Sequence, residues 1–147
     1  MAADDNILRN LDDRRIVSAI REAERNTSGE IKVHIEGHCS TGIIARSCFV
    51  FDKLQLDKTK QRNGVLFYLA YKDKKFAILG DKGINDVVDE HFWDDIKNEM
   101  ASFFKRGDFD DGLIHGILAC GMKLKEYFPH LQDDENEISD EISHGDD

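Results

Sequence analysis

An uninterrupted apolar run, GVLFYLAY, occupies residues 64–71. A run of this length without polar residues is typical of a β-strand that is covered on both faces. Residues 76–79 are also apolar and follow the polar turn at residues 72–75. We expect them to return as an antiparallel strand in a hairpin. The sequence therefore predicts a central strand with packing layers on both sides.

Residues 30–36 predict another strand, in which apolar and polar side chains alternate. Its apolar face consists of Ile31, Val33 and Ile35, and its polar face of Lys32, His34 and Glu36. We expect the apolar face to pack on the core and His34 to be half-exposed on the other side.

Apolar residues recur at helical spacing in four further segments, residues 11–25, 44–54, 92–104 and 113–124. In the second of these the apolar stripe consists of Ile44, Cys48, Phe51 and Leu54. Glycines 112, 116 and 121 would let the last helix approach its neighbours closely. The helix between the strands at 30–36 and 64–71 makes them parallel through a right-handed crossover. The order of elements predicts an α/β/α sandwich with a small mixed sheet flanked by helices on both faces.

The charge of the chain is concentrated at its end. The formal net charge is −10, and the last sixteen residues read QDDENEISDEISHGDD. A segment with so many carboxylates and so few apolar groups cannot bury enough surface to order itself. We therefore expect a flexible N-terminus at residues 1–10, one domain at residues 11–130, and a disordered acidic tail at residues 131–147. The tail would solubilise the domain or capture a basic partner.

Composition also restricts location and partners. The N-terminus has no secretory pattern, and no apolar run reaches the roughly 20 residues needed to span a bilayer. The acidic balance argues against nucleic acid and against anionic membranes as partners. The three cysteines form no CxxC pair, which predicts reduced thiols. We expect a cytoplasmic, monomeric protein without stable membrane insertion.

The predicted topology brings three polar segments to one edge of the sheet. Glu30 starts one strand, Arg62 and Asn63 precede the central strand, and Asp81 follows the third, with Asp86 close behind it. Carboxylate and amide oxygens are the ligands that Ca²⁺ and Mg²⁺ prefer. Converging carboxylates also need a compensating charge, which a cation or Arg62 could supply. The alternative is that these residues serve only as turn and helix-capping residues.

Several segments together resemble the TPM domain family: residues 16–24, 27–33, 45–54, 62–66, 76–84, 92–93, 104, 107 and 112–113. The resemblance covers roughly residues 11–128, and the chain looks like the short soluble bacterial branch that lacks a signal peptide and a membrane anchor. It implies an α/β/α sandwich, a divalent cation (commonly calcium) at an acidic loop cluster and, for some plant members, acid phosphatase activity. Glu30, Asn63 and Asp81 match the family's motif positions, and Asp86 is added from topology.

Two functions follow from these expectations. The first is a module that binds a divalent cation, Ca²⁺ or alternatively Mg²⁺, at Glu30, Asn63, Asp81 and Asp86 and contacts another protein whose identity is unknown. The second is a metal-dependent phosphomonoesterase in which Arg62 balances the charge of the phosphate. The sequence contains no activated nucleophile and no paired-metal motif, so whether the chain is an enzyme stays open.

Overall fold

The computed structural model describes residues 12–130 and 141–145. Its sheet has the strand order β3-β2-β1-β4, in which β4 is the two-residue strand Ser143–His144. Strands β1 (Glu30–Glu36) and β2 (Gly64–Ala70) are parallel, and β3 (Lys75–Gly80) returns antiparallel to β2. The predicted mixed sheet with a central second strand is confirmed.

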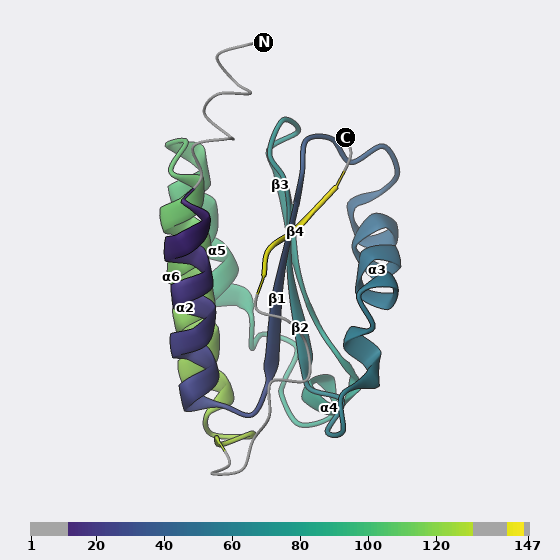
Figure 1. The fold of residues 1–147 in the computed structure, drawn as a ribbon, viewed down its shortest axis with the longest axis vertical. Helices are drawn as coiled ribbons and strands as arrows, with labels where there is room; N and C mark the ends of the chain where they lie inside the picture. The colour runs from purple at the N-terminus through teal and green to yellow at the C-terminus, as the bar shows by residue number, and fades with distance from the viewer. Residues whose placement is uncertain (1–11, 131–140, 146–147) are drawn as a thin grey trace.

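Helices cover both faces of this sheet (Figure 1). One face carries three helices: α2 (Asp13–Asn26), α5 (Asp94–Lys105) and α6 (Phe109–Leu124). The other face carries α3 (Ile43–Lys53), and two short elements lie near the sheet end, η1 (Leu56–Lys58) and α4 (Lys82–Asn85). The predicted α/β/α sandwich is therefore confirmed.

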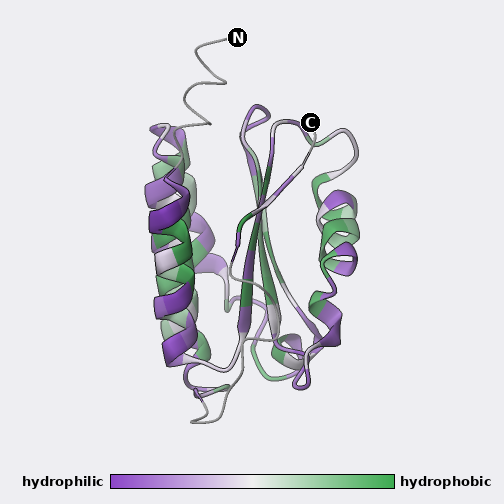
Figure 2. Cartoon of the chain, viewed as in Figure 1, coloured by the Kyte–Doolittle hydropathy of each residue, from purple (hydrophilic) through white to green (hydrophobic). Residues whose placement is uncertain are grey.

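Every residue of β2 is buried, as its apolar run predicts. Alternate side chains of the strand enter two different cores. Val65, Phe67 and Leu69 belong to the larger core beneath α2, α5 and α6. Leu66, Tyr68 and Ala70 pack with residues of α3 and η1 on the other side. In Figure 2 the helices accordingly carry both green and purple residues, as amphipathic helices do.

Helix α3 turns a different face to the sheet from the one its apolar spacing predicts. Its buried residues are Ser47, Val50 and Phe51, whereas Ile44 is 59% exposed and Cys48 is also exposed. Ser47 can be buried because its hydroxyl donates a hydrogen bond to the Ile43 carbonyl at 2.6 Å. The predicted apolar stripe was therefore wrong at Ile44 and Cys48. The helix buries Ser47 in their place, because the hydrogen bond within the helix satisfies its hydroxyl.

Part of the acidic tail is ordered against the sheet, which differs from the expected disorder. Strand β4 (Ser143–His144) pairs in parallel with β1, and the N–H of Gly145 donates to the carbonyl of Ile35 at 2.9 Å. Ile142 packs on the larger core, which offsets the entropy lost on ordering. The rest of the expected tail, residues 131–140 and 146–147, lies outside the described residues, as does the N-terminal segment 1–10.

None of the helices within residues 12–130 and 141–145 has the length and apolarity that crossing a bilayer requires.

Candidate functional site

The end of the sheet near α4 gathers the three polar segments that the topology predicts (Figure 1). Glu30 stands opposite Gly64 in the parallel register, and its N–H donates to the carbonyl of Asn63 at 3.3 Å. The N–H of Asp81 donates to the carbonyl of Gly64 at 2.9 Å. The segment at residues 63–64 therefore ties the start of β1 to the end of β3. This places Glu30, Asn63 and Asp81 at one end of the sheet.

All three of these polar residues are buried: Glu30, Asn63 and Asp81 are 3%, 2% and 7% exposed. The backbone N–H of Asn63 donates to Thr59 Oγ1 at 3.1 Å, and its Nδ2 donates to Ser28 Oγ at 3.3 Å. With its amide nitrogen used in this way, the group that Asn63 can offer to a cation is Oδ1.

Arg62 supplies the charge that compensates Asp81. Its Nε and one terminal nitrogen donate to the two oxygens of Asp81 at 2.7 and 3.0 Å, and the N–H of Lys82 donates to the same carboxylate at 2.8 Å. The hydrogen bond to Asp81 and the charge of Asp81 raise the pKa of Arg62. The Arg62 side chain is nevertheless 47% exposed. The pair is therefore half open to solvent, unlike a buried ion pair.

Asp86 lies at the edge of this group and not within it. It follows α4 as its C-cap residue, its side chain is 58% exposed, and it accepts a hydrogen bond from Lys82 Nζ at 2.8 Å. An exposed ion pair of this kind between residues four apart is typical of a solvated helix surface.

Asp57 is a carboxylate near this end of the sheet that sequence reasoning missed. Its charge contributes to the raised pKa of Arg62, after the contributions of Asp81. One of its oxygens, Oδ1, is buried and has no hydrogen-bond partner among the described residues. Asp57 belongs to η1, whose Leu56 carbonyl lies against Gly64 so closely that an added Cβ would be 2.6 Å away. This contact between η1 and the start of β2, which side-chain periodicity does not predict, brings Asp57 near the site.

The residues at this end of the sheet offer several oxygen donors. Buried carboxylates, an amide oxygen and an orphaned carboxylate oxygen are oxygen donors of the kind that Ca²⁺ and Mg²⁺ take. Within the part of the chain that the structure describes, no three His, Cys, Asp or Glu side chains are already gathered closely enough to hold a metal ion. Residues that hold a cation here would therefore have to rearrange, and Arg62 is the group that would leave Asp81.

A second polar group lies on the same face of β1 as Glu30, at the end of the strand that pairs with β4. The carboxylate of Glu36 accepts hydrogen bonds from Arg46 Nε and a terminal nitrogen, both at 2.8 Å, and from the hydroxyl of Tyr68. His34 Nε2 lies 3.0 Å from Glu36 Oε1, and His34 Nδ1 lies 2.9 Å from Ser143 Oγ. Because an ionised carboxylate only accepts, we assign the ring proton to Nε2, so that Nδ1 accepts from Ser143.

The surroundings of this second group shift its pKa values. Burial raises the pKa of Glu36, but the hydrogen bonds from Arg46, Tyr68 and His34 outweigh it and lower that pKa to about 2. Burial lowers the pKa of His34, more than the hydrogen bond to Glu36 raises it. Burial and the bond to Glu36 raise the pKa of Tyr68. At neutral pH the group therefore contains an ionised Glu36, a neutral His34 and a neutral Tyr68.

Sequence reasoning placed His34 and Glu36 on the polar face of β1 and expected His34 to be half-exposed. In the structure both residues are buried, His34 at 5% exposure and Glu36 at 1%. The sequence did contain a signal for this burial. In a sheet that is predicted to carry helices on both faces, polar side chains on either face have little access to solvent. The covering contribution of Ser143 could not be foreseen, because the tail was expected to be disordered.

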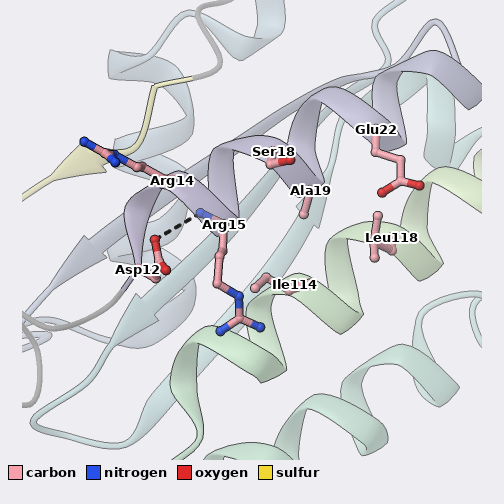
Figure 3. A pocket seen from close by; sticks show the side chains of 8 residues that line it. All are labelled: Asp12, Arg14, Arg15, Ser18, Ala19, Glu22, Ile114 and Leu118. Carbon is pink, nitrogen blue, oxygen red and sulfur yellow. Dashed lines mark hydrogen bonds between the residues drawn. The ribbon is translucent and has the colours of Figure 1, made fainter.

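A pocket in the helical layer adds no group to either polar site. It lies between α2 and α6, as Figure 3 shows, and is lined by Asp12, Arg14, Arg15, Ser18, Ala19, Glu22, Ile114 and Leu118. Arg15 reaches across it to Asp110 and Asp111 on α6, at 3.4 and 2.8 Å. Exposed ion pairs across a helix–helix seam serve packing, so this pocket is not the candidate site.

Comparison with known proteins agrees with the fold and with the sequence resemblance. A family model described as the TPM domain matches residues 2–123. A solved structure, the NMR structure of the BA42 protein from the psychrophilic bacterium Bizionia argentinensis, is 50% identical and superposes with a TM-score of 0.86, covering 90% of this chain and 92% of that one. No curated protein matches the sequence. Because the family model spans most of the chain, the protein belongs to the TPM domain family.

Proposed function

We propose that this TPM domain is a divalent-cation-binding module, with Ca²⁺ as the expected ion and Mg²⁺ as the alternative, and that the cation prepares the sheet end for contact with another protein. The observation that carries the proposal is the burial of Glu30, Asn63 and Asp81 at one end of the sheet. Burying two carboxylates is costly unless positive charge is supplied. Arg62 supplies such charge to Asp81, and a bound cation would supply it to several oxygens of the site at once.

Exchange between Arg62 and the cation is the central step of the proposed binding. Arg62 holds both oxygens of Asp81, yet its side chain is about half exposed. It can therefore swing into solvent without entering the core. Glu30, the Oδ1 of Asn63 and Asp81 would hold the ion. The Oδ1 of Asp57 would gain a partner, while its other oxygen lies 3.7 Å from Lys58 Nζ. Asp86, which is exposed and paired with Lys82, would stay at the rim of the site.

The test uses amide NMR spectra of the full chain titrated with CaCl₂ and, separately, MgCl₂. Saturable shifts are expected around Glu30, Asn63 and Asp81. Asp81→Asn should weaken binding by at least about tenfold, because it removes a charged ligand. Arg62→Gln should strengthen binding, because it removes the competitor for Asp81. The matched control is Asp52→Asn, which removes one charge from an exposed position on α3.

These variants move the affinity in opposite directions, so general loss of stability cannot imitate the result. If neither cation shifts these amides in the wild-type chain, the proposal is wrong. The same conclusion holds if Arg62→Gln and Asp81→Asn both leave the affinity unchanged. Equal weakening by Asp86→Asn and Asp81→Asn would move the site outward, to include the end of α4.

A second candidate is phosphomonoester hydrolysis, which is favoured by the name TPM_phosphatase that the matching family model carries. A bound cation would supply electrophilic polarisation of a phosphate oxygen. The released guanidinium of Arg62 would bind another phosphate oxygen, and a carboxylate such as Asp81 would orient a water molecule. Hydrolysis of p-nitrophenyl phosphate should then require the cation and be lost in both Arg62→Gln and Asp81→Asn. Cation binding without turnover would leave only the binding module.

A further inference from the structure

The edge of β1 is covered, within the described residues, by the short segment at residues 141–145. Each residue of that segment meets a different feature of the main domain. The carbonyl of Glu141 accepts from Lys32 Nζ, Ile142 packs on the larger core, and Ser143 bonds to His34. The N–H of Gly145 donates to the carbonyl of Ile35. The segment is therefore held as an added parallel strand with specific side-chain contacts.

The contact at Gly145 is the most selective of these. A Cβ added there would lie 2.2 Å from Glu36 Oε1 and 2.6 Å from Glu36 Cβ. Glu36 cannot move aside cheaply, because Arg46 and Tyr68 hold its carboxylate from two directions. The position next to Glu36 therefore accepts glycine and rejects every larger residue.

The side chains that this segment contacts along the edge of β1, together with the residues that hold them, form what we call the groove. None of them comes from the tail. Lys32, His34 and Glu36 come from β1, Arg46 from α3, and Tyr68 from β2. His34 stacks on Tyr68 with ring centroids 5.8 Å apart and an interplanar angle of 13°. Because these groups fix one another, the groove would keep its shape when the segment leaves. An edge strand with a preformed row of partners is a template for another extended chain.

The requirements of the groove can be read from its present occupant. Moving along the segment, it takes a backbone carbonyl at Lys32, an apolar side chain on the core, a hydroxyl at His34, a side chain directed away from β1 and then glycine. The fourth of these is His144, which is 55% exposed and whose Nε2 lies 3.6 Å from the equally exposed carboxylate of Asp13 on α2. The tail also contains a near repeat, EISD at residues 137–140 before EISH at residues 141–144. A slip of four residues would put Glu141 against Glu36, so Gly145 also selects the register.

We propose that the edge of β1 is a binding groove for an extended peptide of the pattern apolar–Ser–any–Gly that runs parallel to β1. Residues 142–145 of the same chain occupy this groove and compete with such a peptide from a partner protein. Strand β4 has only two residues, and short peripheral elements open locally before the core does. Displacement therefore needs no unfolding of the main domain. The groove differs from the cation site, because its contacts lie at residues 32–36 of β1 and do not include Glu30.

The experiment uses the full chain carrying Gly145→Val and a synthetic peptide of residues 137–147 with the natural sequence. The variant should lose the hydrogen-exchange protection of the amide at position 145 by about tenfold or more, because its hydrogen bond to Ile35 is broken. Adding the natural peptide should restore the wild-type NMR signals of His34 and Ile35. A peptide carrying Gly145→Val is the matched control and should not restore them. The wild-type chain should bind the natural peptide at least about tenfold more weakly than the variant does, because its own segment competes.

Equal binding of the two peptides, or no binding of either to the folded variant, would overturn the proposal. Hydrogen exchange in the wild-type chain is an independent check that needs no variant. The Gly145 amide should exchange much faster than amides of β2, which open only with the whole domain. Exchange of Gly145 as slow as that of β2 would show that the segment does not leave by itself and would also reject the proposal.

Discussion

Two buried carboxylates of this domain each form an ion pair with an arginine, but the two pairs differ in how far they are enclosed. Glu36 is enclosed by Arg46, Tyr68 and His34, and none of its carboxylate surface is exposed. Asp81 is held by Arg62 and by one backbone N–H, and the arginine is half exposed. A closed network resists exchange because every partner would be left unsatisfied. Glu36 is thus suited to fix structure, and Asp81 is suited to change partners.

Replacing Glu36 by glutamine should destabilise the domain. The ordinary pKa of 4.5 falls to about 2 in the folded chain, so the ionised form is favoured by folding. Losing this preference should cost about 3 kcal/mol of unfolding free energy at pH 7. Urea denaturation of Glu36→Gln and of the exposed control Asp52→Asn measures the difference. A loss no larger than that of the control would show that the network does not stabilise the fold.

Acid should weaken the same network in two pH ranges. His34 has a lowered pKa, so the unfolded chain takes up a proton near the ordinary value of 6.5 while the folded chain does not, and stability falls as pH drops below that value. Glu36 also has a lowered pKa, and its contribution is lost as pH falls from 4.5 to about 2. The difference in unfolding free energy between wild type and Glu36→Gln should therefore shrink between pH 5 and pH 2, as measured by denaturation at each pH. A difference independent of pH would contradict this account.

Among the elements, α6 depends most on its glycines. A Cβ added at Gly121 would lie 2.8 Å from both Cα and Cβ of Ala23, so α2 and α6 approach each other at backbone distance. One added at Gly116 would meet the sulfur of Met100 on α5 at 2.4 Å. The three-helix layer therefore packs through small residues on α6, as the glycines in the sequence predict.

Gly121→Ala tests this packing. The alanine improves helix propensity by about 1 kcal/mol, but its methyl group meets rigid backbone, and overpacking costs roughly 1–3 kcal/mol. We expect a net loss of stability by thermal unfolding. Gly42→Ala is the control, because an added Cβ there has no neighbour within 4 Å, and it should change stability by less than about 0.5 kcal/mol. A stabilised Gly121→Ala chain would show that α2 can move away without penalty.

Element prediction from the sequence succeeded where side-chain period alone decides structure. The apolar run gave β2, the alternation gave β1, and the helical spacing gave α2, α5 and α6. Helical spacing also gave α3, but its buried face was predicted wrongly because the helix buries Ser47, whose hydroxyl bonds to the Ile43 carbonyl. Strand β4 was not predicted, since its two residues carry no periodic signal. A strand this short is specified by its partner, here the edge of β1, and not by its own sequence.

At the scale of the whole molecule, topology carried the site prediction further than any motif did. Parallel β1 and β2 with an antiparallel β3 necessarily place Glu30, Asn63 and Asp81 at one sheet end. The particular partners could not be predicted in the same way. Asp57 comes to Arg62, and Ser143 to His34, only through packing of η1 and of the tail segment. Such contacts depend on tertiary structure that periodicity does not describe.

The net charge of −10 sets how the proposed cation binding must be measured. Any salt reduces repulsion among carboxylates, so Ca²⁺ would stabilise the molecule slightly even without a site. Binding at a specific site differs because the added stability depends on the ratio of the free ion concentration to Kd. At a free ion concentration of 100 times Kd the gain is about 2.7 kcal/mol, which raises Tm by roughly 5–10 °C for a chain of this size. The Tm should therefore rise with CaCl₂ well beyond its rise in NaCl of equal ionic strength. Asp81→Asn should remove the excess and keep the NaCl response, since the substitution changes only one of many charges. An equal rise in both salts would mean that the ion acts on the overall charge and not at the end of the sheet.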